Sequence, residues 1–274
     1  MNIFLTGATG FIGKNFIHLA KKNNHYIYAP TRKKIKKKND RIKWLNGPFE
    51  GNWKKELLNS NILVHFASSG LNSNIEDIYD VNLFKSLNLL KNAIKYRCKK
   101  WLIISTSSEY GPSKKKNAYN FSLRTQRIPD TDYGLSKALF TDHSIRLAKK
   151  HNCKVRIMRL FPIFGKGENK KRLYPSLLKS IKQKKNFYLK NPNETRDFTN
   201  VNFAVKILLD ALNFDKKKFK NYQIWHVSEN KPKKIKDFVK ETCNKNNSKI
   251  EINSSNKKKI MFNHISDKNS VWKI

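Results

Sequence analysis

Short runs of apolar residues alternate along much of this chain with stripes, segments in which apolar residues recur at the period of a helix. Each run is too short for a helix and suits a buried strand. The stripes, in which apolar residues recur every three or four positions, are typical of helices that pack one face on a core. Strands that alternate with helices in this way predict an α/β fold with a parallel sheet. The runs interpreted as strands lie at 3–5, 26–29, 42–45, 61–69, 101–104, 154–160 and 222–227.

The predicted helices occupy the stretches between these runs. One helix begins after Gly13, and another is expected over 80–96. The apolar stripe of the second consists of Val81, Phe84, Leu87, Leu90 and Ile94. Further helices are expected over 133–150, 172–183 and 235–243.

Three glycines, each three residues apart, join the first strand to the first helix. Gly7 would let the chain turn tightly, Gly10 has no side chain to block a pyrophosphate, and Gly13 would let helix and strand pack closely. The free N–H groups at the helix N-terminus could then hold phosphates. Glycines also mark ordinary turns, but this strand–turn–helix context favours dinucleotide binding.

The run at 61–69 ends in small residues, which would leave room for a ligand in the crevice of an open sheet. His65 lies inside this apolar run. We interpret it as a packed, hydrogen-bonded core residue and not as a ligand or a catalytic base.

The residues after the second strand bear on the choice of dinucleotide. An NAD-binding unit usually places Asp or Glu about 20 residues past the glycine turn, where it binds the ribose 2′-hydroxyl. No acid occurs between Gly13 and Asp40, and Arg32 and Lys33 stand near that position instead. An arginine fork suits a 2′-phosphate. We therefore expect NADP with NAD as the alternative, unless Arg32 simply begins the lysine-rich loop that follows.

The chain is strongly basic, with 58 Lys and Arg against 20 Asp and Glu, a net charge of +38. Such a charge is compatible with a nucleic-acid or acidic-surface binder. However, aromatic residues are not interleaved with the lysines as a stacking platform would require. We favour a charge spread over solvated faces and expect no specific nucleic-acid partner. Lysine clusters occur at 33–34, 36–38, 114–116, 216–218 and 257–259.

Other features of composition narrow the class of protein. No run approaches the ~18 apolar residues that span a bilayer, and the glycine turn interrupts any secretory signal at the N-terminus. The three cysteines are few, odd in number and widely separated. We therefore expect a cytoplasmic protein with no membrane partner, no disulfides and no metal site.

The candidate chemistry lies at the start of the helix over 133–150. Tyr133 and Lys137 are four residues apart, so both can reach one ligand. A nearby lysine cation favours a phenolate and would pull the tyrosine pKa down from about 10. Such a tyrosine can exchange a proton with an oxygen at a carbon undergoing hydride transfer. Thr106, at the end of the preceding strand, could hydrogen-bond to that same oxygen.

These segments resemble the extended short-chain dehydrogenases/reductases of the nucleotide-sugar epimerase/dehydratase kind. The matching segments are 6–13 for TGxxGFIG, 63–67 for VIHLA, Val81-Asn82 for VN, 105–111 for SSxxVYG, and Tyr133 with Lys137 for YxxxK. The resemblance implies a Rossmann-type doubly wound parallel sheet with a small C-terminal substrate-binding lobe. Residues 1–165 would form the NAD(P)-binding domain with the catalytic residues. Residues 166–274 would mainly form the lobe, with segments that return to the first domain.

The resemblance also implies individual roles. Catalytic roles are implied for Thr106, Tyr133 and Lys137. Together with Arg32 and Lys33, the expected cofactor contacts are Gly7, Thr9, Gly10, Phe11, Ile12, Gly13, Phe66, Ala67, Tyr133, Lys137, Pro162 and Ile163. The expected substrate contacts are Ser107, Ser108, Arg172 and Arg196.

Two segments of the second half are similar to family motifs. Residues 159–167 resemble LRxxNVYGPG, but Pro162 replaces the asparagine and Phe164 the tyrosine, which removes polar contacts from those side chains. Residues 196–201 resemble RDFxxV, whose arginine pairs with the nucleotide diphosphate in the family. Without the resemblance, Arg196 could be a surface charge or could pair with Asp197.

The expected reaction is reduction of a 4-keto-6-deoxy nucleotide sugar by NADPH. Tyr133 would protonate the keto oxygen, Thr106 would polarise it, and Lys137 would tune Tyr133 and bind the nicotinamide ribose. A dehydratase of this family would carry Asp-Glu where Ser107 and Ser108 stand, and alternation would turn Glu109 away if the chain stays extended.

A nucleotide-sugar 4-epimerase with tightly held NAD is the alternative, and a redox-silent NADP-binding sensor or scaffold is the alternative of another class. The resemblance also implies a homodimer through the helices near 80–96 and 133–150.

Overall fold

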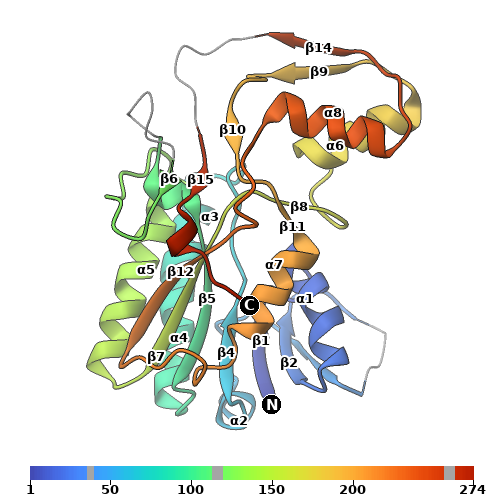
Figure 1. Ribbon diagram of the computed structural model, residues 1–274. Coiled ribbons are helices and arrows are strands. Elements are labelled where there is room, and N and C mark those ends of the chain that lie inside the picture. Colours follow the sequence, from blue (N-terminus) through green and yellow to red (C-terminus); the bar gives the residue numbers. More distant parts are fainter. Residues whose placement is uncertain (36–39, 113–119, 256–262) are drawn as a thin grey trace.

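In the computed structural model of the protein, residues 1–35, 40–112, 120–255 and 263–274 are described (Figure 1). The lysine clusters at 36–38, 114–116 and 257–259 lie outside these ranges. Figure 1 shows a large layered part that carries both marked termini and a smaller lobe above it.

A seven-stranded sheet, parallel throughout, forms the centre of the large part. Its strands are β1 (Asn2–Thr6), β2 (Tyr26–Thr31), β3 (Ile42–Asn46), β4 (Ile62–His65), β5 (Lys100–Thr106), β7 (Lys154–Leu160) and β12 (Tyr222–Val227). They lie in the order β12-β7-β5-β4-β1-β2-β3. This is a doubly wound order, so the predicted Rossmann-type α/β class is confirmed.

Helices cover both faces of this sheet because successive residues of each strand point to opposite sides. Ile3 and Leu5 of β1 pack in one hydrophobic cluster with α1 (Phe11–Lys22) and α7 (Val201–Asp210), whereas Phe4 packs in the other. The second cluster contains residues of α2 (Lys54–Leu58), α4 (Ser86–Lys95) and α5 (Asp132–Lys150).

The helix expected over 80–96 begins earlier and changes its winding. α3 (Ile75–Tyr79) runs into a π-helical segment, Asp80–Lys85, which continues into α4. A π-turn adds a residue to the turn and shifts the phase of the side chains. Phe84 is 64% exposed, while its neighbour Leu83 is buried. The predicted apolar stripe is wrong at Phe84, because repeated spacings of three drift round a helix and the buried face carries Leu83, Ser86 and Leu90 instead.

The lobe has a hydrophobic cluster of its own. It consists of α6 (Leu173–Gln183), α8 (Ile235–Lys245) and the parallel pair β9 (Phe187–Lys190) and β14 (Ile252–Ser255). Leu177, Phe187 and Val239 are buried in this cluster, separate from the two clusters of the sheet. Between α6 and α8 the chain returns to the large part to form α7 and β12 (Figure 1).

Short strand pairs connect the two parts. β8 (Ile163–Phe164) pairs with β11 (Thr199–Asn200), β10 (Thr195–Arg196) with β13 (Lys233–Lys234), and β6 (Asn120–Phe121) with β15 (Ile265–Ser266). After β15 the chain runs back to the sheet, where the backbone N–H of Trp272 donates to the His226 carbonyl at 3.0 Å. The buried Trp272 ring lies 4.5 Å from the Arg156 guanidinium.

Cys98, Cys153 and Cys243 are buried free thiols. Within the described ranges, no cluster of three or more His, Cys, Asp or Glu side chains could hold a metal ion. In the same ranges, no helix has the length and apolar character needed to cross a membrane.

Candidate active site

The carboxyl ends of β1, β4 and β5 meet at one edge of the sheet. Strand order reverses between β1 and β4, which is where open α/β sheets bind ligands in a crevice. Thr6, His65 and Thr106 are the last residues of these three strands. The sheet therefore brings the glycine turn and the predicted catalytic threonine to the same edge.

The glycine turn is built as its spacing predicts. Gly7 adopts a positive φ of 67°, and a Cβ there would lie 2.6 Å from the Ala67 nitrogen. A Cβ on Gly13 would lie 2.2 Å from the Gly7 carbonyl oxygen, so only glycine lets α1 approach the turn this closely. Gly10 caps α1 without a side chain that bonds the first N–H groups. This cradle fits a diphosphate.

Thr6 links the turn to the end of β4. Its hydroxyl accepts hydrogen bonds from the N–H groups of Phe66 at 3.2 Å and Ala67 at 3.1 Å. It also contacts His65 Nδ1 at 2.8 Å, and His65 Nε2 lies 2.9 Å from Ser86 Oγ. Burial lowers the pKa of His65 to about 3. His65 is thus the packed, hydrogen-bonded residue that we expected.

Other predicted cofactor contacts surround this edge. Arg32 and Lys33 are exposed and follow β2, the neighbour of β1. Pro162 and Ile163 follow β7, and the Pro162 carbonyl already accepts the Thr199 N–H at 2.9 Å. That carbonyl is therefore committed to the β8–β11 junction.

The N-terminus of α5 packs directly against the end of β5. Thr131 caps the helix by accepting the Gly134 N–H at 3.1 Å. A Cβ on Gly134 would lie 2.5 Å from the Ser108 carbonyl oxygen, so the helix approaches the short 3₁₀ helix Ser107–Tyr110 as closely as glycine permits. This contact places Tyr133 next to Thr106, whose hydroxyl accepts the Ser108 N–H at 3.1 Å.

Of the two predicted catalytic residues of α5, Lys137 is buried and Tyr133 is half-buried in this structure. Burial raises the pKa of Tyr133, although hydrogen bonding with Ser68 and Thr106 and the positive charge of Arg172 oppose the rise. Burial lowers the pKa of Lys137 to about 8, and the negative charge of Glu109 opposes that shift. Our expectation that Lys137 lowers the pKa of Tyr133 is wrong for this structure. Burial raises this pKa by more than the nearby cation, Arg172, lowers it.

Glu109 occupies an unexpected environment. The chain does not stay extended after Thr106 but turns into the 3₁₀ helix, and Glu109 is fully buried. Its carboxylate pairs with Arg159 at 2.9 Å and Arg127 at 3.1 Å. The expectation that strand alternation turns Glu109 away from the reacting groups assumed an extended chain, and the 3₁₀ helix removes that premise.

The predicted substrate residues fall on two sides of the crevice. Ser107 and Ser108 lie at the end of β5, where the Ser107 hydroxyl contacts His264 Nδ1 at 3.2 Å. Arg172 pairs with Glu168 at 3.3 Å at the start of α6, and its charge reaches Tyr133.

Arg196 is held by a different partner than the sequence indicates. It pairs with Glu194 at 2.9 Å, and its buried Nε has no hydrogen-bond partner. Asp197 instead accepts hydrogen bonds from the Ser228 hydroxyl and from the Lys231 N–H at 3.1 Å. The alternative in which Arg196 pairs with Asp197 is therefore wrong.

Sequence reasoning missed two residues that border the site. Ser68 reaches Tyr133 because the buried Asn82 holds the loop: its Oδ1 accepts from the Ser69 N–H at 2.8 Å and the Ser68 hydroxyl at 2.9 Å. The Val81-Asn82 motif was the available signal. His264 arrives from the C-terminal segment, and nothing in its sequence context indicates the contact with Ser107.

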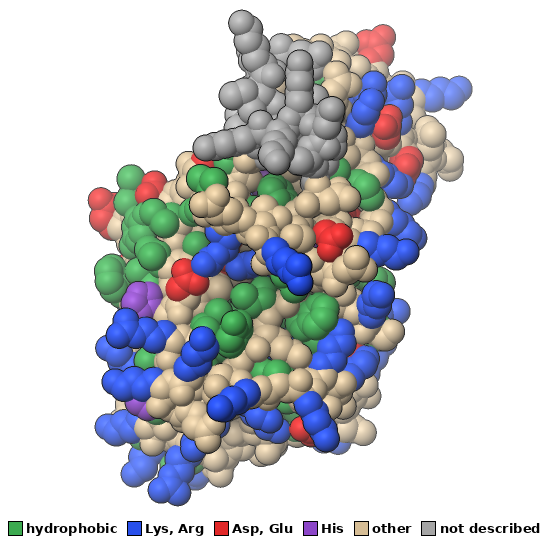
Figure 2. Space-filling view, turned by 60° about the vertical axis from the view of Figure 1, so that its left-hand side comes forward, with side chains coloured by type: hydrophobic (Ala, Val, Ile, Leu, Met, Phe, Trp, Pro, Cys, Tyr) green, Lys and Arg blue, Asp and Glu red, His purple; other side chains and the backbone are tan. Residues whose placement is uncertain are grey.

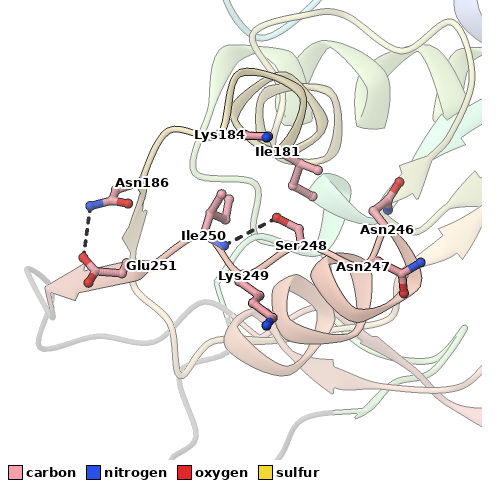
Figure 3. A pocket seen from close by; sticks show the side chains of 9 residues that line it. All are labelled: Ile181, Lys184, Asn186, Asn246, Asn247, Ser248, Lys249, Ile250 and Glu251. Carbon is pink, nitrogen blue, oxygen red and sulfur yellow. Dashed lines mark hydrogen bonds between the residues drawn. The ribbon is translucent and has the colours of Figure 1, made fainter.

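A hollow of about 590 Å³ lies elsewhere, at the outer end of the lobe (Figure 3). Residues 246–251 after α8 line it, together with Ile181, Lys184 and Asn186. None of the predicted catalytic, cofactor or substrate residues lines this hollow. It is therefore distinct from the candidate active site.

Sequence comparison relates the chain to enzymes that act on sugars carried by nucleotides. A family described as "NAD dependent epimerase/dehydratase family" matches residues 3–224. CDP-abequose synthase of Salmonella typhimurium is 26% identical over 252 residues, which cover 86% of this chain and 78% of that protein. GDP-6-deoxy-D-talose 4-dehydrogenase of Aggregatibacter actinomycetemcomitans is 28% identical over 216 residues, which cover 76% of this chain and 69% of that protein.

Solved structures share the fold. UDP-glucose 4-epimerase of Thermotoga maritima, with UDP-glucose, superposes with a TM-score of 0.84 at 18% identity, covering 97% of this chain and 90% of that one. MoeE5 in complex with UDP-glucuronic acid and NAD gives a TM-score of 0.86 at 16% identity, and the match covers 98% of this chain and 91% of that one.

Proposed function

The chain belongs to the NAD-dependent epimerase/dehydratase family, and from that premise we propose that it is an NAD(P)-dependent enzyme that reduces a 4-keto-6-deoxy nucleotide sugar. The proposal rests mainly on one observation: Thr106 and Tyr133 pack together at the sheet edge that holds the glycine cradle. Lys137 lies one turn further along α5. The similarity to CDP-abequose synthase supports reduction in particular.

The proposed chemistry assigns one task to each residue. Bound reduced nicotinamide supplies a hydride to the keto carbon. Tyr133 donates its proton to the developing alkoxide, and Thr106 hydrogen-bonds to the same oxygen. Lys137 would hold the nicotinamide ribose. Cofactor contacts come from the glycine cradle, with Thr9, Phe11 and Ile12 at the start of α1.

Substrate binding is proposed at the opposite wall of the crevice. Arg172 and Arg196 are suited to a diphosphate, because a guanidinium fork binds phosphate oxygens in bidentate fashion. The unpartnered Nε of Arg196 supports this assignment. Ser107 and Ser108 would face the sugar. Dehydration is disfavoured because these two positions hold serines and because Arg127 and Arg159 already hold Glu109.

A cofactor titration followed by a substrate panel tests the proposal. We expect the purified protein to bind NADPH more tightly than NADH, and to lose reduced-nicotinamide absorbance only when a CDP-, GDP-, UDP- or dTDP-linked 4-keto-6-deoxy sugar is added. Tightly retained NAD without net NADPH oxidation would support the 4-epimerase instead. Cofactor binding without turnover of any sugar would support a redox-silent sensor, and no cofactor binding would overturn all three.

The variant Arg32→Ala tests the preference for NADP. Loss of a charged hydrogen bond costs about 1.5–3 kcal/mol, which corresponds to a roughly 10–100-fold weaker affinity for NADPH. NADH affinity should stay unchanged, because NADH has no 2′-phosphate. Lys22→Ala, at the opposite end of α1, serves as the control for lost surface charge. Equal weakening of both cofactors in Arg32→Ala would contradict the assignment.

We also propose a homodimer formed by the flank that carries α3, α4 and α5. Phe84 is 64% exposed, and Leu135 and Ile75 are 40% and 57% exposed. Figure 2 shows hydrophobic side chains between Lys and Arg side chains on the side of the molecule that carries α5. Light scattering should give twice the mass of a single chain, and Phe84→Asp should reduce it to the monomer mass. A wild-type protein with the mass of a single chain would rule out the homodimer.

A further inference from the structure

Glu109 is the most heavily hydrogen-bonded carboxylate near the candidate site. It accepts from Arg159 Nη2 at 2.9 Å and Arg127 Nη1 at 3.1 Å on one oxygen, and from the hydroxyls of Thr141, at 2.7 Å, and Ser105 on the other. Donors therefore reach it from β5, β7, α5 and the segment before α5. These four donors fix the position of the carboxylate.

This carboxylate lies against the same face of α5 as Lys137. Thr141, which donates to Glu109, stands one helical turn after Lys137, and residues four apart share a helix face. Arg127, which also holds Glu109, contacts the carbonyl of Ala138, the residue after Lys137. Glu109 is thus anchored beside the helix turn that carries Lys137.

Lys137 is a buried cation that lacks a direct ion pair. Its side chain is almost completely buried, and no salt bridge joins it to another residue within the described ranges. The groups that interact with it are His65 at the end of β4, the Phe140 ring at 5.9 Å and Glu109. Tyr133 lies one turn earlier on the same helix. Of these, only Glu109 carries a negative charge at neutral pH, with Arg159 and Arg127 behind it.

We propose that Glu109 is a positioning residue whose buried carboxylate keeps Lys137 protonated next to Tyr133. An ammonium group taken out of water tends to lose its proton unless an opposite charge is near. Glu109 supplies this charge through its field and not through a contact, so the Lys137 ammonium stays free to bind the cofactor. The inference rests on the proposed cofactor role of Lys137.

The test is the pH dependence of NADPH affinity, followed by nicotinamide fluorescence, in Glu109→Gln. Wild-type affinity should weaken as the pH rises past the pKa of Lys137, which lies at about 8. Removing an opposite charge should move this weakening to lower pH by about 1–3 units. Glu109→Asp keeps the charge and should restore most of the wild-type profile. A purely structural role would lower stability in both variants without moving the profile.

Asp142→Asn is the matched control. Asp142 pairs with the same Arg127 at 2.6 Å but is exposed, so its removal should leave the pH profile unchanged. An unchanged profile in Glu109→Gln, or an equal shift in Asp142→Asn, overturns the inference. Failure of the wild type to bind NADPH would instead overturn the proposed function, and the inference with it.

A direct titration covers the case in which Glu109→Gln does not fold. In the wild type labelled with ¹³C at lysine Cε, the Lys137 signal, assigned by its loss in Lys137→Arg, should titrate at or above neutral pH. A Lys137 that is already deprotonated below neutral pH would show that no effective counter-charge reaches it and would overturn the inference.

Discussion

Tyr133→Phe should lower kcat by a factor of about 10²–10⁴, the usual contribution of a positioned general acid, while NADPH affinity stays near the wild-type value. The substitution removes only the hydroxyl that hydrogen-bonds with Ser68 and Thr106. The ring remains to pack at the start of α5, so the fold should be retained. Steady-state rates with the best keto sugar of the panel measure kcat, and a separate cofactor titration measures NADPH affinity.

The control for this variant is Tyr188→Phe, which removes a hydroxyl from an exposed ring on β9 in the lobe. It should leave kcat unchanged. A Tyr133→Phe enzyme that keeps its full kcat would show that another group protonates the product. A loss of NADPH affinity as large as the loss of kcat would point to a role in cofactor binding.

Gly13→Ala should abolish measurable cofactor binding and destabilise the fold. The added Cβ would lie 2.2 Å from the Gly7 carbonyl oxygen and 2.8 Å from the Ala8 Cα, both backbone atoms that cannot rotate away. To relieve the overlap, α1 must move away from the turn, at a cost of about 1–3 kcal/mol for an overpacked site. The helix N–H groups would then leave the positions that suit a diphosphate.

Gly70→Ala is the matched control, because a Cβ there meets no atom within 4 Å. Urea unfolding and cofactor titration should distinguish the two variants. If Gly13→Ala binds NADPH like the wild type, the close approach of α1 to the turn is not needed for binding.

The sheet could be predicted from the sequence because its strands are short apolar runs, of which the central ones are buried on both faces. The strands at 154–160 and 222–227 begin and end in the structure at the residues that the apolar pattern predicts. The π-helical segment before α4 could not be predicted, because the apolar period carries no sign of an inserted residue.

The candidate site was predictable only where its residues belong to local motifs. Tyr133, Lys137 and the glycine turn are each defined by spacing along the chain. His264 comes beside Ser107 through the pairing of β15 with β6, a contact between segments far apart in sequence. The direction of the pKa shift of Tyr133 also depends on burial, which the spacing of Tyr133 and Lys137 does not reveal.

The separate hydrophobic cluster of the lobe has a consequence for the evolution of specificity. Its buried residues, such as Leu177 and Val239, pack among themselves and not with the clusters beneath the sheet. Substitutions at sites that share no partners change stability additively. Under the proposed function, the lobe can therefore accumulate changes that suit it to a new sugar without weakening the sheet, which would carry the reactive groups.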